Sequence, residues 1–205
     1  MRILVTAGPT REHLDRVRFL SNAATGLMGI EVARAAAGAG HDAVLVLGPT
    51  HVAPPVDARI RVVRTVSAQD MLDACRDVWP SCDALVATAA VSDFRFAVRH
   101  EGKPEKTAGT LTVDLVPTPD VLATLAADKG ARRVVGFALQ VEDAELRARD
   151  KLHRKNCDMI VLDSPAAMGA ERSDFTLIPR EGAVRRMDDA SKSDVARAIV
   201  AFVTD

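Results

Sequence analysis

Lysine is scarce in this sequence, and its positions give the first indication of chemistry. Six lysines stand against 21 arginines, and none precedes Lys103. Four of the six form two pairs, Lys103 with Lys106 and Lys151 with Lys155. A compact ammonium on a flexible stem suits the oxygens of a triphosphate, whereas arginine suits fixed planar ligands. The pairs favour a polyphosphate site, against the alternative that they are merely solvated on a loop and a helix face.

Three glycines near the N-terminus are the next candidates for phosphate binding. Gly8 follows the first apolar run directly, and Gly26 and Gly29 stand where a helix should begin. Glycines at a helix start let backbone N–H groups approach phosphate oxygens, with help from the helix dipole. Their spacing is neither GxGxxG nor GxxxxGK[ST], which argues against a Walker-type ATPase. The alternative is that they serve a turn and close packing of the helix on the sheet.

Two short polar side chains complete this set. Asn22 lies in a long loop, where its amide could donate to a carboxyl or acyl group, unless it only forms a local Asx turn. Asp93 follows Ala89-Ala90-Val91-Ser92 and precedes Phe94 at the end of an expected strand. It could bind ribose hydroxyls or a phosphate-bound metal, or it could cap a turn or a helix.

The elements that must position these residues alternate between short β-branched runs and longer segments of helical period. This alternation predicts an α/β fold with a parallel sheet. In such a sheet ligands bind beyond the carboxyl ends of the strands, where several candidates fall. We expect strands over 2–7, 42–47, 59–64, 83–89, 133–138 and 158–162, and helices over 29–39, 67–78, 119–127, 142–155 and 191–203.

Two regions interrupt the alternation. Residues 8–29 separate the first strand from its helix, where an ordinary connection takes about 2–6 residues. Residues 95–116 begin as a polar loop and end in an alternating run, 110–116, which is typical of a half-exposed strand that pairs away from the main sheet. We find no internal repeat or linker. We therefore expect one domain over 1–205, with a protruding arm at about 95–118.

Composition narrows the function classes. Lys and Arg total 27 against 28 Asp and Glu, so the net charge is close to zero. The chain as a whole therefore has no positive electrostatic potential that would favour binding to nucleic acid or anionic lipid. No apolar run approaches the ~20 residues of a membrane helix, and no export leader is visible, so we expect a cytoplasmic protein. The three cysteines and five histidines show no metal-site spacing. The absence of tyrosine excludes an oxidoreductase that uses a Tyr/Lys acid–base pair.

Read in order, the motifs resemble the phosphopantothenoylcysteine synthetase family, a coenzyme A pathway ligase often fused behind a flavin-dependent decarboxylase domain. They run through nearly the whole chain, and so many in order are far more specific than any one. The motifs are Val5-Thr-Ala-Gly-Pro-Thr-Arg-Glu with Asp15, Val17-Arg-Phe-Leu-Ser-Asn22, Gly26-Leu-Met-Gly29, Leu47-Gly-Pro, Ala89-Ala-Val-Ser-Asp-Phe, Lys103-Pro-Glu-Lys106, Pro117-Thr-Pro-Asp, Val135-Gly-Phe-Ala and Lys151-Leu-His-Arg-Lys155-Asn-Cys-Asp158.

The resemblance implies a Rossmann-like, doubly wound sheet with helices on both faces, and a reaction in two steps. The carboxylate of 4′-phosphopantothenate attacks the α-phosphate of CTP and releases pyrophosphate, and the amine of L-cysteine then displaces CMP. Mg²⁺ accompanies CTP, no flavin is needed, and the arm helps to build a homodimer whose sites are completed across the interface. Because a reactive mixed anhydride must be kept away from water, we also expect the arm to act as a lid over the site. Since no decarboxylase domain is present, the chain should ligate but not decarboxylate, with a separate decarboxylase as a candidate partner.

The resemblance also implies residue roles. Asn22 would hold the acyl cytidylate, Arg18 would assist catalysis or bind substrate phosphate, and Lys103 would contact the nucleotide or neutralise the activation transition state. Phe137 would line the nucleotide pocket, and Lys151 and Lys155 would receive triphosphate oxygens. The other expected nucleotide contacts are Gly8, Gly26, Gly29, Ala89, Asp93, Phe94 and Lys106. No protein side chain is assigned as a dedicated metal ligand.

The chain departs from the family pattern at several positions. Leu27 stands where a lysine is frequent, Glu105 where a basic residue is usual, and Gln140 where many members carry an acidic group. Leu162-Asp163 replaces an Ala-Asn pair, and Pro104 replaces an isoleucine-like residue. These changes touch nucleotide contacts and leave the choice between CTP and ATP open. They also motivate a rival hypothesis, a non-catalytic nucleotide-binding module.

A second rival is a dinucleotide-dependent Rossmann reductase. It requires a tight GxGxxG turn and an acidic residue at the end of the second strand. The sequence offers neither, since Leu47-Gly-Pro-Thr50 occupies the second position.

Overall fold

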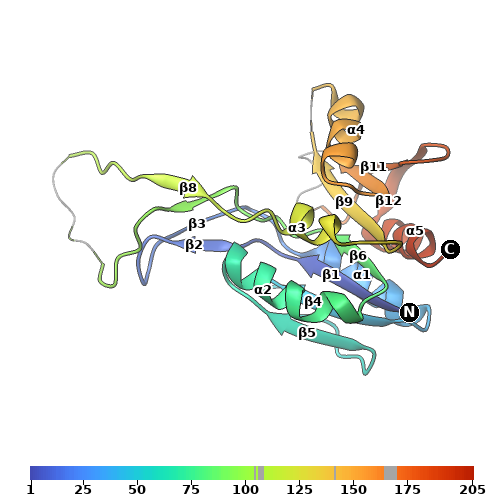
Figure 1. Ribbon diagram of the computed structural model, residues 1–205, viewed down its shortest axis with the longest axis horizontal. Coiled ribbons are helices and arrows are strands. Elements are labelled where there is room, and N and C mark those ends of the chain that lie inside the picture. Colours follow the sequence, from blue (N-terminus) through green and yellow to red (C-terminus); the bar gives the residue numbers. More distant parts are fainter. Residues whose placement is uncertain (104, 106–108, 141, 164–169) are drawn as a thin grey trace.

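The computed structural model describes residues 1–103, 105, 109–140, 142–163 and 170–205. Its main body is an eight-stranded sheet in the order β12-β11-β10-β9-β6-β1-β4-β5 (Figure 1). The strands are β1 (Arg2–Ala7), β4 (Asp42–Leu47), β5 (Ile60–Arg64), β6 (Ala84–Ala87), β9 (Arg133–Leu139), β10 (Met159–Asp163), β11 (Arg172–Pro179) and β12 (Arg185–Ser191).

Six of these strands are parallel. Numbered by their order along the chain, β5-β4-β1-β6-β9-β10 read 3-2-1-4-5-6, the order of a doubly wound dinucleotide-binding sheet. The strand order therefore reverses between β1 and β6. The antiparallel hairpin β11–β12 extends the sheet beyond β10. The α/β, Rossmann-like prediction is confirmed, whereas the hairpin was not predicted.

Five α-helices in the described residues cover the two faces of the sheet. Helices α1 (Leu27–Gly38) and α5 (Lys192–Thr204) pack on one face, with alternate β1 residues Ile3 and Val5 in their core. Helices α2 (Ala68–Val78), α3 (Val121–Ala127) and α4 (Ala144–Arg154) pack on the other, where Leu4 belongs to their core. A short 3₁₀ helix, η1 (Trp79–Ser81), follows α2. Because β1 is buried on both faces, its sequence is almost continuously apolar.

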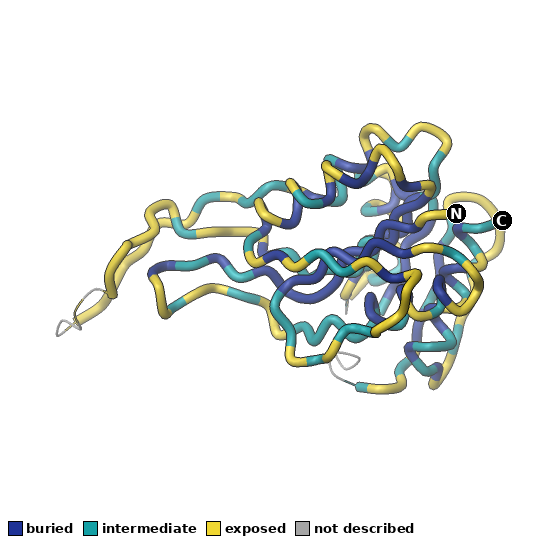
Figure 2. The backbone as a smooth tube through the Cα atoms, turned by 90° about the horizontal axis from the view of Figure 1, so that it is seen from below, coloured by how far each residue is buried: buried dark blue, intermediate teal, exposed yellow. Residues whose placement is uncertain are grey.

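Two small antiparallel hairpins project from the carboxyl side of the sheet (Figure 1). One joins β2 (Arg11–His13) to β3 (Phe19–Ser21), and the other joins β7 (Phe94–Phe96) to β8 (Leu115–Pro117). The backbone N–H of His100 donates to the Leu14 carbonyl at 2.8 Å and ties the hairpins together. Figure 2 shows mostly exposed residues along the outer part of the β7–β8 hairpin, whereas Leu14 and Asp15 in the turn of the β2–β3 hairpin are buried.

The arm at 95–118 thus corresponds to β7, β8 and the segment between them. Its alternating run was expected to be a strand over 110–116, and this was wrong in extent. Only Leu115–Pro117 form a strand, while residues 110–114 are exposed and irregular. The prediction that this strand pairs outside the main sheet is confirmed by the β7–β8 pairing.

None of the helices in the described ranges is long and apolar enough to cross a membrane.

Candidate active site

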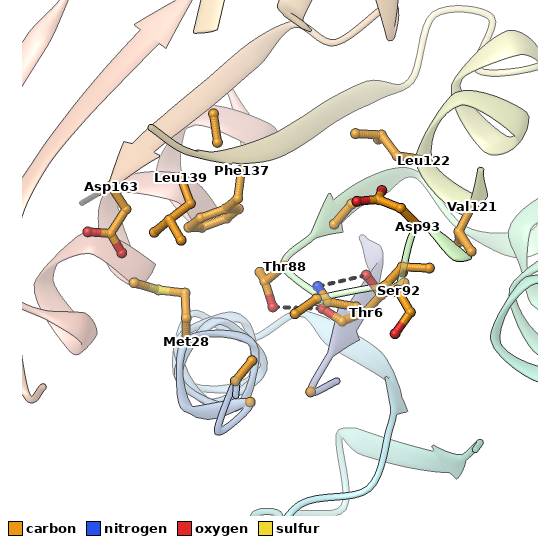
Figure 3. Close-up of a pocket in the computed structure, with 18 of the residues that line it drawn as sticks. Thr6, Met28, Thr88, Ser92, Asp93, Val121, Leu122, Phe137, Leu139 and Asp163 are labelled. Carbon is orange, nitrogen blue, oxygen red and sulfur yellow. Dashed lines mark hydrogen bonds between the residues drawn. The ribbon is translucent and has the colours of Figure 1, made fainter. Parts of the chain in front are cut away.

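A pocket of about 430 Å³ opens at the carboxyl ends of β1, β6 and β9, at the point where the strand order reverses. Loops after these strands form its floor, and the starts of α1 and α3 and one side of α4 form its walls. Seven of the predicted site residues line it: Gly8, Gly26, Ala89, Asp93, Phe137, Lys151 and Lys155. Figure 3 shows Asp93 toward one end of this pocket and Asp163 toward the other.

The start of α1 gives the pocket a wall of backbone N–H groups. Gly26 is the N-cap residue of α1, with φ of 79° in the left-handed region, and a Cβ there would lie 3.1 Å from the backbone of Gly8. Gly8 itself has φ of 77°. Both positions therefore require glycine, and both lie where a phosphate can reach the first turn of α1.

Gly29 has a different role from the predicted one. Helix α1 begins at Leu27 and not at Gly29, so Gly29 lies within the first turn. A Cβ on Gly29 would overlap the Cβ of Ala7 and approach Thr88 Oγ1 to 2.5 Å. Gly29 does not line the pocket. The packing alternative raised by the sequence therefore accounts for this glycine.

The lysine pair of α4 reaches the pocket from the opposite face. Lys155 Nζ pairs with the Asp120 carboxylate, and the other oxygen of Asp120 accepts the Ala123 N–H and caps α3. Burial lowers the pKa of Lys151, while the nearby Cys157 and Asp93 act in the opposite direction. A bound polyanion would further favour the ammonium form of Lys151. The pocket thus presents cations and helix amides around one space.

Asn22 lies against the outside of the pocket wall. Its Nδ2 donates to the carbonyl oxygens of Ala90 at 3.1 Å and Val91 at 3.4 Å, and both of these residues line the pocket. Ser21 anchors the same segment, because its hydroxyl donates to the Thr10 carbonyl at 2.6 Å.

Arg18 lies on the turn of the β2–β3 hairpin and does not line the pocket. Its guanidinium pairs with the buried carboxylate of Asp15 at 2.6 Å. The backbone N–H groups of Arg18 and Val17 also donate to Asp15, and these bonds, with that of Arg18 foremost, lower the pKa of Asp15 to about 2. The Arg18 side chain is 40% exposed overall.

Two predicted residues of the arm, Lys103 and Phe94, do not line the pocket. Lys103 is exposed near the outer end of the arm, and Phe94 is 48% exposed on β7, so neither lines the pocket of this chain. Lys106 lies outside the described residues. The structure of one chain therefore does not bring Lys103 to the lysines of α4.

Sequence reasoning missed Lys192, which lines the pocket from the first position of α5. Its only sequence signal was a lysine directly after the N-cap residue Ser191, which is more typical of a solvated helix start. Asp120 also lines the pocket and was noted only within a motif.

No group of three or more metal-ligating side chains occurs among the described residues. Three carboxylates line the pocket, and two of them, Asp93 and Asp120, lie on the side where the α4 lysines Lys151 and Lys155 line it. Mg²⁺ is commonly held by one or two carboxylates together with substrate phosphates and water. This donor set fits a Mg²⁺ ion that enters with a triphosphate.

Comparisons with known proteins identify the family of this chain. The family model for the DNA/pantothenate metabolism flavoprotein C-terminal domain matches residues 1–205. A "Cysteine/Cysteine sulfinic acid decarboxylase" from an unknown prokaryotic organism is 37% identical over 97% of this chain and 56% of its own length. The "Coenzyme A biosynthesis bifunctional protein CoaBC" of Bacillus subtilis is 36% identical over 97% of the chain and 50% of its length. The chain thus spans about half the length of these relatives.

Solved structures match over almost the whole chain. The C-terminal domain of a CoaBC protein is 35% identical, with a TM-score of 0.84, and the match covers 98% of this chain and 93% of that one. A Cab2 variant in complex with phosphopantothenate-cysteine shares the fold at 17% identity and a TM-score of 0.79, over 98% and 85% of the two chains. The chain belongs to the family of DNA/pantothenate metabolism flavoprotein C-terminal domains.

Proposed function

We propose that this protein is a phosphopantothenate–cysteine ligase. It joins 4′-phosphopantothenate to L-cysteine through an acyl nucleotidylate in coenzyme A biosynthesis. The observation that carries the proposal is the pocket at the reversal of strand order, where the Lys151–Lys155 pair, Asp93 and the start of α1 surround one space. Family membership supports the same reaction.

In the first step, a carboxylate oxygen of phosphopantothenate attacks the α-phosphorus of the nucleotide. The bond to the bridging oxygen of pyrophosphate breaks, and pyrophosphate leaves with the electron pair. Bringing a carboxylate to a triphosphate is electrostatically unfavourable, so positioned cations must offset the charge. Lys151 and Lys155 hold the leaving phosphates, and the amides at the start of α1 hold further phosphoryl oxygens.

In the second step, the cysteine amine attacks the acyl carbon. The bond from that carbon to the phosphate oxygen breaks, the nucleoside monophosphate leaves, and the nitrogen loses a proton as the amide forms. Asn22 orients the acyl group by donating from its amide, next to the loop of Ala90 and Val91. Arg18, held by Asp15, supplies a guanidinium for a substrate phosphate.

The remaining assignments complete this proposal. CTP is the expected nucleotide, with ATP as the alternative, and Mg²⁺ bound by triphosphate with Asp93 would neutralise phosphoryl charge. The protein is a cytoplasmic homodimer, in which the arm brings Lys103 to the partner's pocket. A separate decarboxylase would consume the product.

The test is pyrophosphate release with Mg²⁺, 4′-phosphopantothenate and L-cysteine, with CTP or ATP in parallel and mass detection of the product. We expect pyrophosphate and amide in equal amounts, and the better nucleotide decides the base preference. A protein that binds nucleotide but releases no pyrophosphate would instead be the non-catalytic binding module that the departures at Leu27, Glu105, Gln140 and Asp163 suggest.

A further inference from the structure

Glu12 is a buried acidic residue to which the proposed mechanism gives no role. It is the central residue of β2, and only 5% of its surface is exposed. Its Oε1 accepts the backbone N–H of Ala68 at 2.8 Å, and this contact is buried. Ala68 is the first residue of α2. The Glu12 side chain therefore fastens the β2–β3 hairpin to the start of a helix that packs on the main sheet.

The start of α2 needs an acceptor at this position. The first N–H groups of a helix have no partner within the helix. The Ser67 hydroxyl accepts the Asp70 N–H, and the Asp70 carboxylate accepts the Ser67 N–H. This capping box leaves the N–H of Ala68, a residue with no exposed surface, to be paired from elsewhere. Glu12 supplies that acceptor, and the positive end of the helix dipole favours an acidic group there.

The β2–β3 hairpin carries two residues of the proposed reaction. Arg18 directly precedes β3, and Asn22 directly follows it. Since β3 pairs with β2 in a two-stranded sheet, its position depends on where β2 is held. The Arg11 N–H donates to the Val66 carbonyl at 2.8 Å, so β2 is also tied to the chain just before α2 (Figure 1). The Glu12 bond is the side-chain part of this attachment.

We propose that Glu12 is a positioning residue of the ligase reaction. By holding the β2–β3 hairpin against α2, it keeps Asn22 and Arg18 in place while the cysteine amine attacks the acyl carbon. This inference rests on the proposed function and adds a residue to the same site. Glu12 does not line the pocket, so it acts through the hairpin. A displacement of about 1 Å in a group that orients a substrate can slow a reaction about 10²-fold.

Loss of the Glu12 bond should uncouple the two steps of the reaction. Lys151, Lys155 and the start of α1 line the pocket independently of the hairpin, so the acyl nucleotidylate still forms. When its acyl group is poorly oriented, water competes with the cysteine amine for the acyl carbon. Hydrolysis returns 4′-phosphopantothenate and releases the nucleoside monophosphate. Pyrophosphate is then produced without an equal amount of amide.

The test variant is Glu12→Met, which keeps an extended side chain but has no oxygen to accept the Ala68 N–H. We expect amide formation to fall tenfold or more, while the Kd of the nucleotide changes less than threefold. Pyrophosphate released per amide should rise from one to at least about two. Glu12→Gln keeps the Oε1 acceptor and should return this ratio to near one. A ratio of one in Glu12→Met would overturn the proposal.

Asp70→Ala is the matched control, because it also removes a carboxyl acceptor from the start of α2 but breaks no bond to the hairpin. It should lower thermal stability and leave the ratio at one. An equal rise of the ratio in Asp70→Ala would show that any damage to the helix start has this effect, against a specific role of Glu12. If Glu12→Met does not fold, Ala68→Pro removes the same bond from the other side, since proline lacks the N–H and suits the first helical position.

Hydrogen exchange separates this inference from the proposed function. If Glu12→Met speeds the exchange of backbone amides in residues 11–22 at least tenfold and leaves those of β1 and β4 unchanged, Glu12 holds the hairpin. That result stands even where the unaltered protein makes no amide and the ligase proposal fails. If the ligase is active and these amides exchange as in the unaltered protein, the ligase stands and the inference is wrong.

Discussion

Asn22 is the residue on which the second step of the proposed reaction depends. Asn22→Asp removes the amide donor and places a second negative charge beside the acyl nucleotidylate. We expect nucleotide binding to change less than threefold, because Asn22 contacts the outside of the pocket wall, while amide formation falls by 10²-fold or more, a loss comparable to removing one oriented donor. Calorimetry measures the first quantity and product mass the second.

The control for this variant is Asn156→Asp. Asn156 lies after α4, and its Nδ2 donates to the Ala126 carbonyl away from the pocket. Both variants lose one amide donor to a carbonyl, but only the Asn22 change should stop amide formation. Full turnover by Asn22→Asp would remove this residue from the mechanism.

The packing role of Gly29 can be tested through the stability of the protein, without measuring turnover. Gly29→Ala forces a methyl group against Ala7 and Thr88, and overpacking of this kind costs about 1–3 kcal/mol. Gly38→Ala, at the end of the same helix, meets no atom within 4 Å and should be neutral or stabilising by up to about 1 kcal/mol. Urea unfolding measures both. Equal stabilities of the two variants would contradict the packing role of Gly29.

Among the elements, the β2–β3 hairpin is stabilised by the ionised carboxylate of Asp15. Because its pKa is about 2 in the folded protein against 3.8 for the unperturbed group, Asp15 contributes stability that is complete above pH 4 and is lost as the pH falls through 2. We expect the stability difference between the unaltered protein and Asp15→Asn to shrink over this window. Unfolding free energies measured from pH 5 to pH 2 check it, and a constant difference would contradict the assignment.

How far the sequence could predict each element depended on burial. Strands 2–7 and 42–47 were predicted at their observed bounds, because parallel strands covered on both faces are nearly continuous apolar runs. The hairpin β11–β12 was missed, since an edge hairpin carries charges on its exposed side, as in Arg185-Arg-Met-Asp-Asp-Ala-Ser191. Pattern is a weaker guide where only one face of a strand is buried.

The site residues that could be predicted from the sequence were those whose position follows from the order of the strands. Residues at or just beyond the carboxyl ends of predicted strands, such as Gly8, Asp93 and Phe137, were brought to one pocket because parallel strands end at a common edge. Lys192 was missed because only the packing of α5 across the sheet from α4 brings it there. Gly29 could not be assigned from the sequence to phosphate binding or to packing, because the choice depended on where α1 begins. The first residue of a helix is set by local geometry, which the hydrophobic periodicity of a sequence does not resolve.

For the whole molecule, the proposed reaction needs two chains to build each site. Lys103 lies near the outer end of the arm and does not line its own pocket. If it serves the partner's pocket, Asn22→Asp and Lys103→Gln should each be inactive alone, but mixed dimers should contain one pocket with both natural residues. Random exchange of subunits then restores about a quarter of the activity.

Light scattering or sedimentation establishes the dimer in the same samples. Two controls accompany the mixture: each variant mixed with itself, and a mixture assayed immediately after mixing, before subunits have exchanged. No recovery after demonstrated exchange would show that Lys103 acts within its own chain or not at all.

In the first step of the proposed reaction, the carboxylate is activated by a bond from its own oxygen to the α-phosphorus. The most direct measurement uses 4′-phosphopantothenate labelled with ¹⁸O in its carboxylate, with CTP, Mg²⁺ and L-cysteine, and mass analysis of every phosphate product. The account predicts one labelled oxygen in CMP and none in pyrophosphate. Label in inorganic phosphate, or none in CMP while amide accumulates, would contradict it.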